Sequence, residues 1–144
     1  MRNENMNEPQ NQQSCQTAVM VSAGSVNKMK SYNVNIYCGL QETYDKNKTN
    51  SIEDVFKICD DFVNEVKDCV SVTETNFRYV DGSEKGIIVG YINYPRFPRT
   101  EKEILERALQ LANKLMIGLN QFRVTIVTDK ESIMLENDNV LRWS

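Results

Sequence analysis

The segment NYPRFPRT, which begins at Asn93, brings together side chains that suit a nucleotide-like ligand. Arg96 and Arg99 offer planar guanidinium groups whose forked donors match the oxygen atoms of a phosphate. Tyr94 and Phe97 offer flat rings on which a nucleobase can stack, and the amide of Asn93 can both donate and accept hydrogen bonds. The segment therefore predicts a binding site for a small molecule that carries a phosphate and a base together.

The same segment leads directly into a strong helix start. Thr100 and Glu103 form the T-x-x-E pattern of a capping box, and the N-terminal end of a helix attracts anions. Pro95 and Pro98 hold the backbone stiff, which lowers the entropy lost when the loop becomes ordered. A purely structural alternative stays open, in which the prolines end a strand and start the helix while the arginines only cover an edge.

The composition narrows the chemistry that the chain can perform. None of the 144 residues is histidine, which removes the usual general base, the Ser/His and Cys/His nucleophile pairs and the commonest zinc ligand. We therefore expect no catalytic residue, no metal and no cofactor, and hence no enzyme. The net charge of −3 argues against binding to polymeric nucleic acid, because proteins that bind it generally carry an excess of basic residues.

Signals for export and for membranes are lacking in the sequence. The polar N-terminus has no apolar core of a signal peptide, and no apolar run reaches the roughly 18 residues that a membrane span needs. The four cysteines include no C-x-x-C pair. These features predict a cytoplasmic protein with reduced thiols, in which Cys38 and Cys59 fall on apolar faces and fill the core.

Hydrophobic periodicity predicts the elements that position the segment. Alternation indicates strands, an apolar stripe at helical spacing indicates helices, and the Asp-Gly pair of DGSE indicates a hairpin turn. The expected strands cover 33–40, 69–80, 85–94, 122–128 and 132–137, and the expected helices cover 52–66 and 100–119. Val72 and Phe77 have opposite parity within one strand, so either a bulge shifts the register or both faces are partly covered.

This order of elements predicts a ferredoxin-like α+β fold, a βαββαβ antiparallel sheet with two helices on one face and an extra C-terminal strand. Residues 32–144 are expected to form this single domain, and the Asn- and Gln-rich residues 1–31 a flexible N-terminal tail. The face without helices carries Tyr37, Arg123 and Thr125 and needs water, a ligand or another subunit to cover it.

The stretches VNIYCGL (34–40) and GYINYPRFPRT (90–100), in a short chain without histidine, resemble the first family of Thoeris anti-defence proteins. These are phage sponge proteins that oppose Thoeris defence, and the resemblance covers about residues 34–137. It implies that a cyclic ADP-ribose isomer, made by a bacterial TIR-domain enzyme, is bound and sequestered without being degraded; some members also bind cyclic oligonucleotides. It further implies a homo-oligomer built from dimers, with pockets near subunit contacts, in the cytoplasm of the bacterial host.

The resemblance also points to particular residues of this chain. Asn93, Arg96, Phe97 and Arg99 match the polar, cationic and stacking roles, and Arg123 adds a contact from the open sheet face. Two other functions stay open beside it. The chain can be a small protein-interaction module, such as a phage-encoded inhibitor that binds a host protein through its open sheet face, or a small enzyme or ligand-sensing domain that relies on Glu, Asp, Tyr or Lys.

Overall fold

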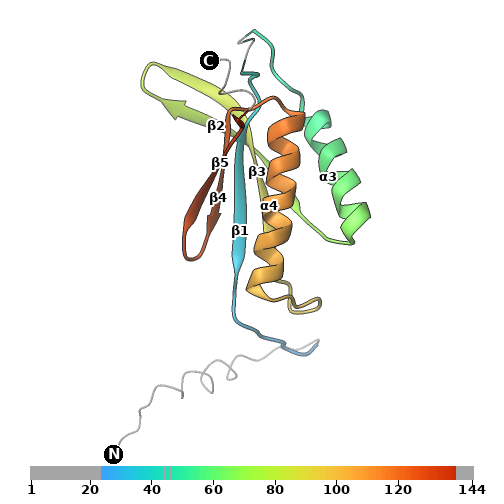
Figure 1. The fold of residues 1–144 in the computed structure, drawn as a ribbon. Coiled ribbons are helices and arrows are strands. Elements are labelled where there is room, and N and C mark those ends of the chain that lie inside the picture. The colour runs from blue at the N-terminus through green and yellow to red at the C-terminus, as the bar shows by residue number, and fades with distance from the viewer. Residues whose placement is uncertain (1–23, 44, 46, 139–144) are drawn as a thin grey trace, which may run out of the picture.

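The part of the chain that the structure describes forms one twisted sheet with two helices, in the order expected from the sequence (Figure 1). The computed structural model describes residues 24–43, 45 and 47–138. Within these residues the elements are β1 (Asn33–Gly39), α3 (Ile52–Val66), β2 (Ser71–Tyr79), β3 (Gly82–Ile92), α4 (Glu101–Gly118), β4 (Arg123–Thr128) and β5 (Ser132–Glu136). Both predicted helices and all five predicted strands are therefore present.

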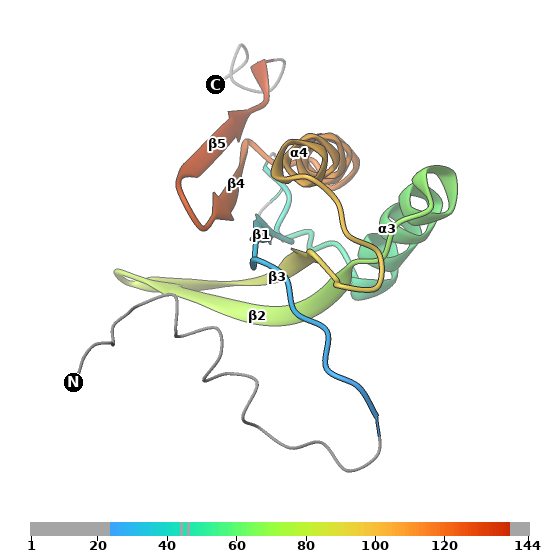
Figure 2. The same ribbon diagram turned by 90° about the horizontal axis from the view of Figure 1, so that it is seen from below.

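The sheet has the strand order β2-β3-β1-β4-β5, and every neighbouring pair of strands is antiparallel. The first four strands have the order of a ferredoxin-like sheet, and β5 extends it beyond β4. Figures 1 and 2 show α3 and α4 on the same face of the sheet. The prediction of a ferredoxin-like α+β fold with an extra C-terminal strand is confirmed.

Both helices begin at capping boxes, which satisfy the first backbone N–H groups of a helix. In α3, the hydroxyl of Ser51 accepts from the backbone N–H of Asp54 at 3.2 Å, and the Asp54 carboxylate accepts from the Ser51 N–H at 2.9 Å. In α4, Thr100 and Glu103 make the same exchange at 3.1 and 3.0 Å. The capping box predicted at Thr100 is confirmed, and it fixes where α4 starts.

The core lies between the helices and one face of the sheet. The alternation along the central strands places one set of apolar side chains against the helices, and these are fully buried. They include Val34, Ile36, Ile87, Val89, Val124 and Ile126. Cys38 and Cys59 are buried with them and have free thiols, as expected from the apolar faces on which they lie.

The β2–β3 hairpin keeps one register along its whole length, from Ser71 opposite Gly90 to Tyr79 opposite Gly82. No bulge therefore separates Val72 from Phe77. Val72 packs against the core, whereas Phe77 lies on the opposite face with its ring directly over Gly86. Of the two alternatives for this strand, the one with both faces partly covered is confirmed.

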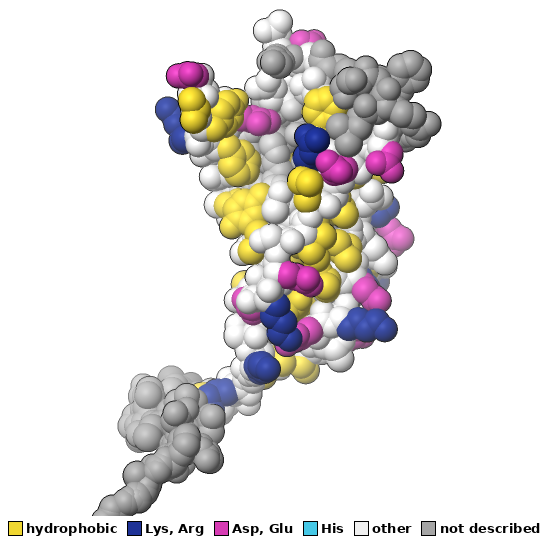
Figure 3. All heavy atoms as spheres, turned by 60° about the vertical axis from the view of Figure 1, so that its left-hand side comes forward, with side chains coloured by type: hydrophobic (Ala, Val, Ile, Leu, Met, Phe, Trp, Pro, Cys, Tyr) yellow, Lys and Arg dark blue, Asp and Glu magenta, His cyan; other side chains and the backbone are white. Residues whose placement is uncertain are grey.

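The face of the sheet away from the helices is open, as the sequence predicts. Tyr37 on β1 lies between Ile88 and Thr125 on the neighbouring strands, and Met134 follows on β5. Figure 3 shows apolar side chains spread over this side of the molecule, with charged groups among them. No helix in the described part of the chain is long and apolar enough to cross a membrane.

The predicted N-terminal tail falls mostly outside the described residues. Residues 1–23 lie beyond them, so no structural statement applies to that part of the tail. Residues 24–31 are exposed and form no helix or strand. β1 begins at Asn33, and the division into a tail and a single domain stays a prediction.

Candidate functional site

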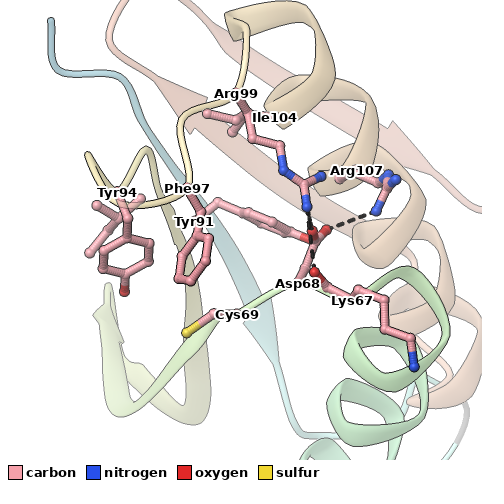
Figure 4. A pocket seen from close by; sticks show the side chains of 10 residues that line it. Lys67, Asp68, Cys69, Tyr91, Tyr94, Phe97, Arg99, Ile104 and Arg107 are labelled. Atoms are coloured by element: carbon pink, nitrogen blue, oxygen red, sulfur yellow. Dashed lines mark hydrogen bonds and ion pairs between the residues drawn. The ribbon is translucent and has the colours of Figure 1, made fainter. Parts of the chain in front are cut away.

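A cavity of about 230 Å³ lies where the end of α3, the end of β3 and the start of α4 meet. We call it the junction pocket (Figure 4). It is lined by Lys67, Asp68, Cys69, Tyr91, Ile92, Tyr94, Phe97, Arg99, Ile104 and Arg107. Figure 4 shows a charged end, where Asp68 meets Arg99 and Arg107, and an aromatic end, formed by Tyr94 and Phe97; the ammonium group of Lys67 points away from the charged end.

The charged end is organised around Asp68, whose side chain is only 4% exposed. Nη2 of Arg99 lies 2.7 Å from one carboxylate oxygen, and Nη1 of Arg107 lies 3.1 Å from the other. The hydroxyl of Tyr91 donates a further hydrogen bond of 2.7 Å to that second oxygen. A buried carboxylate needs such partners, because an unpaired buried charge is costly.

The arginines also complete the C-terminal end of α3, where no basic residue lies in the last turn. Lys67 takes the left-handed backbone conformation of a C-cap, with φ of 62°. Arg107 donates to the carbonyl of Val66 at 3.1 Å, and Arg99 donates to that of Lys67 at 3.4 Å. Positive charge at this end is favourable, since a helix carries a partial negative charge there.

The connection between β3 and α4 is held by Asn93, which is buried. Its side-chain amide donates to the carbonyl of Arg99 at 3.0 Å and accepts from the N–H of Arg99 at 2.9 Å. A turn closed by the hydrogen bond from the N–H of Phe97 to the carbonyl of Tyr94 lies between them. Asn93 thus fixes the loop that presents Tyr94, Phe97 and Arg99 to the pocket.

The aromatic end is more open to solvent. The Phe97 side chain belongs to a residue that is 66% exposed, and the guanidinium carbon of Arg96 lies 5.3 Å from the centre of the Phe97 ring. This is within the range of a cation–π contact. Tyr94 is half-buried and interacts with the thiol of Cys69.

Both tyrosines of the pocket have pKa values above the ordinary value for tyrosine. Burial is the main cause for Tyr91, and the hydrogen bond that its hydroxyl donates to Asp68 adds to it, so its pKa lies well above 10. Partial burial raises the pKa of Tyr94, and its interaction with Cys69 adds to this. Both phenols are therefore protonated near neutral pH and serve as hydrogen-bond donors.

The predicted site residues occupy four different places in the structure. Tyr94, Phe97 and Arg99 line the junction pocket, whereas Asn93 supports the loop from behind. Arg96 is exposed beside Phe97.

Arg123 lies on the open face of β4, where its Nε is 2.8 Å from Glu136, and it does not line the junction pocket.

The sequence analysis missed most of the other residues that line the pocket, and among them Asp68, Tyr91 and Arg107 form its charged cluster. One signal for them was present in the sequence. Asp68 follows the end of a helix, where a negative charge is unfavourable unless cations compensate for it. That signal calls for basic partners, and Arg99 and Arg107 supply them. Among the described residues, no group of three or more His, Cys, Asp or Glu side chains is arranged to hold a metal ion.

No family model and no curated protein sequence matches the chain. Two solved structures share its fold. Phage SAM lyase in the apo state superposes with a TM-score of 0.65 at 16% identity, covering 83% of this chain and 97% of that one. Phage SAM lyase in complex with S-methyl-5′-thioadenosine superposes with a TM-score of 0.63 at 14% identity, covering 81% of this chain and 98% of that one.

The expectation that the chain is not an enzyme is contradicted by these two neighbours, because both are structures of an enzyme. The expectation rested on the lack of histidine. That lack argues against acyl transfer and zinc hydrolysis, but it does not exclude the cleavage of an already activated substrate. Sequestration of a cyclic nucleotide stays a prediction, and neither neighbour is a sponge protein.

Proposed function

We propose that this chain is an enzyme of the SAM lyase type, which binds S-adenosylmethionine and cleaves it. The observation that carries the proposal is the match to phage SAM lyase over nearly the whole length of that protein, both apo and with S-methyl-5′-thioadenosine bound. S-methyl-5′-thioadenosine is what remains when the bond between the sulfonium sulfur and the γ-carbon of the amino-acid chain breaks and the bonding electrons pass to sulfur. The γ-carbon then forms its new bond to an oxygen of the substrate's own carboxylate, which closes the amino-acid part into a lactone and balances the step.

The chemistry of this substrate suits a site without histidine. A sulfonium is a good leaving group, so the protein has to supply position and charge rather than a strong nucleophile. The junction pocket offers two exposed or half-buried rings, Tyr94 and Phe97, on which adenine can stack. The protonated hydroxyl of Tyr94 offers a hydrogen-bond donor beside them.

The size of the junction pocket bears on how the substrate is held. At about 230 Å³, it is smaller than the roughly 300–1,000 Å³ of pockets that enclose a whole drug-sized ligand. It therefore holds one part of the substrate, and the rest extends over its open aromatic end. A homo-oligomer, which the sequence analysis predicts, is one way to cover that remaining part, and its formation stays a prediction.

The same comparison supports a proposal about where the protein acts. We propose that the chain is encoded by a phage and acts in the cytoplasm of the bacterial host, where S-adenosylmethionine is available. The cyclic ADP-ribose isomer expected from the sequence also contains adenosine, so the two ligands share the group that the aromatic end would bind. The two functions differ in what happens to the bound ligand, because a lyase converts it to product and a sponge releases it unchanged.

The test is to incubate the purified chain with S-adenosylmethionine and to follow both substrate and product by liquid chromatography with mass spectrometry. S-methyl-5′-thioadenosine should accumulate with time and in proportion to the protein. A variant without the aromatic end, Tyr94→Ala with Phe97→Ala, should form product more slowly, whereas Arg78→Gln in the distant hairpin should not. Full recovery of intact S-adenosylmethionine would overturn the proposal.

A further inference from the structure

We infer that the charged end of the junction pocket is a subsite for an anionic group carried by an adenosine-containing ligand. The inference deepens the proposed function and rests on it for the identity of the ligand. If the ligand is S-adenosylmethionine, the anion is the carboxylate of its amino-acid part. If it is an adenine nucleotide, the anion is a phosphate. Both groups present two or more oxygens to a guanidinium in the same way.

The balance of charge at this end is positive. Arg99 and Arg107 line the pocket together with a single carboxylate, Asp68, and the ammonium group of Lys67 points away from them (Figure 4). Glu103 lies near both arginines, but its carboxylate is exposed and bound to Thr100 in the capping box. Within the pocket lining, two guanidinium groups thus stand against one carboxylate, which favours an anionic group of the ligand at this end.

The arginines keep unused donors. Arg99 uses only Nη2 and Arg107 only Nη1 in their contacts with Asp68 and with the end of α3. Among the described residues, no partner binds Nε or the second Nη of either guanidinium. The two side chains are 30% and 31% exposed, so these donors are accessible to a ligand.

The same contacts hold the guanidinium groups in place before a ligand arrives. Each arginine is bound both to the buried carboxylate of Asp68 and to a backbone carbonyl. Tyr91 supports the carboxylate from the side of β3. Groups that are already ordered lose less entropy on binding, so the arrangement gains affinity from its rigidity.

The alternative is that these ion pairs only join α3 to α4, with no ligand involved. Two matched pairs of probes distinguish a ligand subsite from a purely structural role of these ion pairs. S-adenosylhomocysteine carries the amino acid that S-methyl-5′-thioadenosine lacks, and AMP carries the phosphate that adenosine lacks. In isothermal titration of the unaltered chain, we expect at least one of the two probes that carry a carboxylate or a phosphate to bind about tenfold or more tightly than its partner, as charge-assisted hydrogen bonds allow.

The pair that shows the preference identifies the source of the anion. A preference for S-adenosylhomocysteine that Arg99→Gln removes assigns the subsite to a carboxylate, and a preference for AMP assigns it to a phosphate. The preference should shrink as salt is raised, since salt screens accessible charges. Equal binding within both pairs by the unaltered chain would overturn the inference and leave the arginines with a structural role only.

Variants add a second readout. Arg99→Gln should reduce the preference to near onefold while changing the affinity for the neutral probe much less, an outcome that a general loss of folding cannot produce. Arg78→Gln, which removes an exposed arginine from the hairpin, should keep the preference. An Arg99→Gln chain that retains the full preference would also overturn the inference. Cleavage of S-adenosylmethionine is measured separately, so the lyase proposal and the subsite can fail independently.

Discussion

Arg107 and Asp68 lie 39 positions apart in the chain and are joined by an ion pair of 3.1 Å, which links α4 to the end of α3. Arg99 reaches the same carboxylate from the loop before α4, and Tyr91 reaches it from β3. Three separate elements therefore meet at one buried carboxylate. That meeting point shapes the junction pocket, so the stability of the fold and the geometry of the proposed site depend on the same residue.

The first prediction concerns this carboxylate. Asp68→Ala leaves two arginines and the Tyr91 hydroxyl without their shared partner, so we expect the free energy of unfolding to fall by about 2 kcal/mol or more. Urea denaturation measures the change. Asp61→Ala is the matched control, because its ion pair with Lys57 is exposed and should contribute less than about 1 kcal/mol. Equal effects of the two substitutions would contradict this prediction.

The pocket residues in the loop before α4 could be predicted from the sequence, whereas their ion-pair partners outside the loop could not. Tyr94, Phe97 and Arg99 stand together in the chain, and their chemistry can be read from one short segment. Asp68 and Arg107 come together only because α3 and α4 pack on the same face of the sheet. That packing is a tertiary effect, and local spacing does not show which charges it will pair.

The fold was more accessible than the site. Capping boxes and apolar periodicity act within a few residues, so they locate α4 at Thr100 and separate the strands correctly. The register of β2, in contrast, could not be predicted from local patterns alone. The position of Phe77 was compatible with a bulge, and the outcome depended on Gly86, which leaves room for the ring on the neighbouring strand.

The second prediction tests that contact between Phe77 and Gly86. A side chain at Gly86 would collide with the Phe77 ring and would lie 2.9 Å from the carbonyl oxygen of Cys38. Gly86→Ala should therefore destabilise the chain by about 1–3 kcal/mol, and Phe77→Leu in the same chain should recover part of the loss. Gly24→Ala, with nothing within 4 Å of the added carbon, should be neutral. Thermal unfolding distinguishes these variants, and purely additive effects at Gly86 and Phe77 would disprove the coupling.

The third prediction concerns stability at alkaline pH. Burial raises the pKa of Cys38 to about 12 and that of Cys59 to about 11, from an ordinary value of 9.0. Between pH 9 and pH 11 the unfolded chain loses these protons while the folded chain keeps them. Stability is therefore full below pH 9 and falls above it, by about 1.4 kcal/mol per pH unit for each thiol. Urea denaturation from pH 8 to 11 should show this slope.

A matched variant isolates the contribution of the thiols. Cys38→Val with Cys59→Ala removes both titrating groups and keeps the sites apolar, so the free energy of unfolding should fall less steeply with pH above 9. Tyr91 titrates at still higher pH in the folded chain and is present in both proteins, so it does not affect the difference. Parallel pH profiles of the two chains would contradict the prediction.

The fourth prediction concerns the aromatic end of the junction pocket and the ligand that it holds. Phe97 is largely exposed, so its ring contributes little to the core and can be removed without loss of the fold. If adenine stacks on it, Phe97→Ala should weaken binding of S-methyl-5′-thioadenosine by about 1–3 kcal/mol. Tyr94→Phe keeps a ring and loses only the hydroxyl donor, so its effect should stay near 1 kcal/mol. Tyr79→Ala removes an exposed ring from the hairpin and serves as the control. Calorimetry that finds the Phe97→Ala chain equal to the control would place the adenosine elsewhere on the molecule.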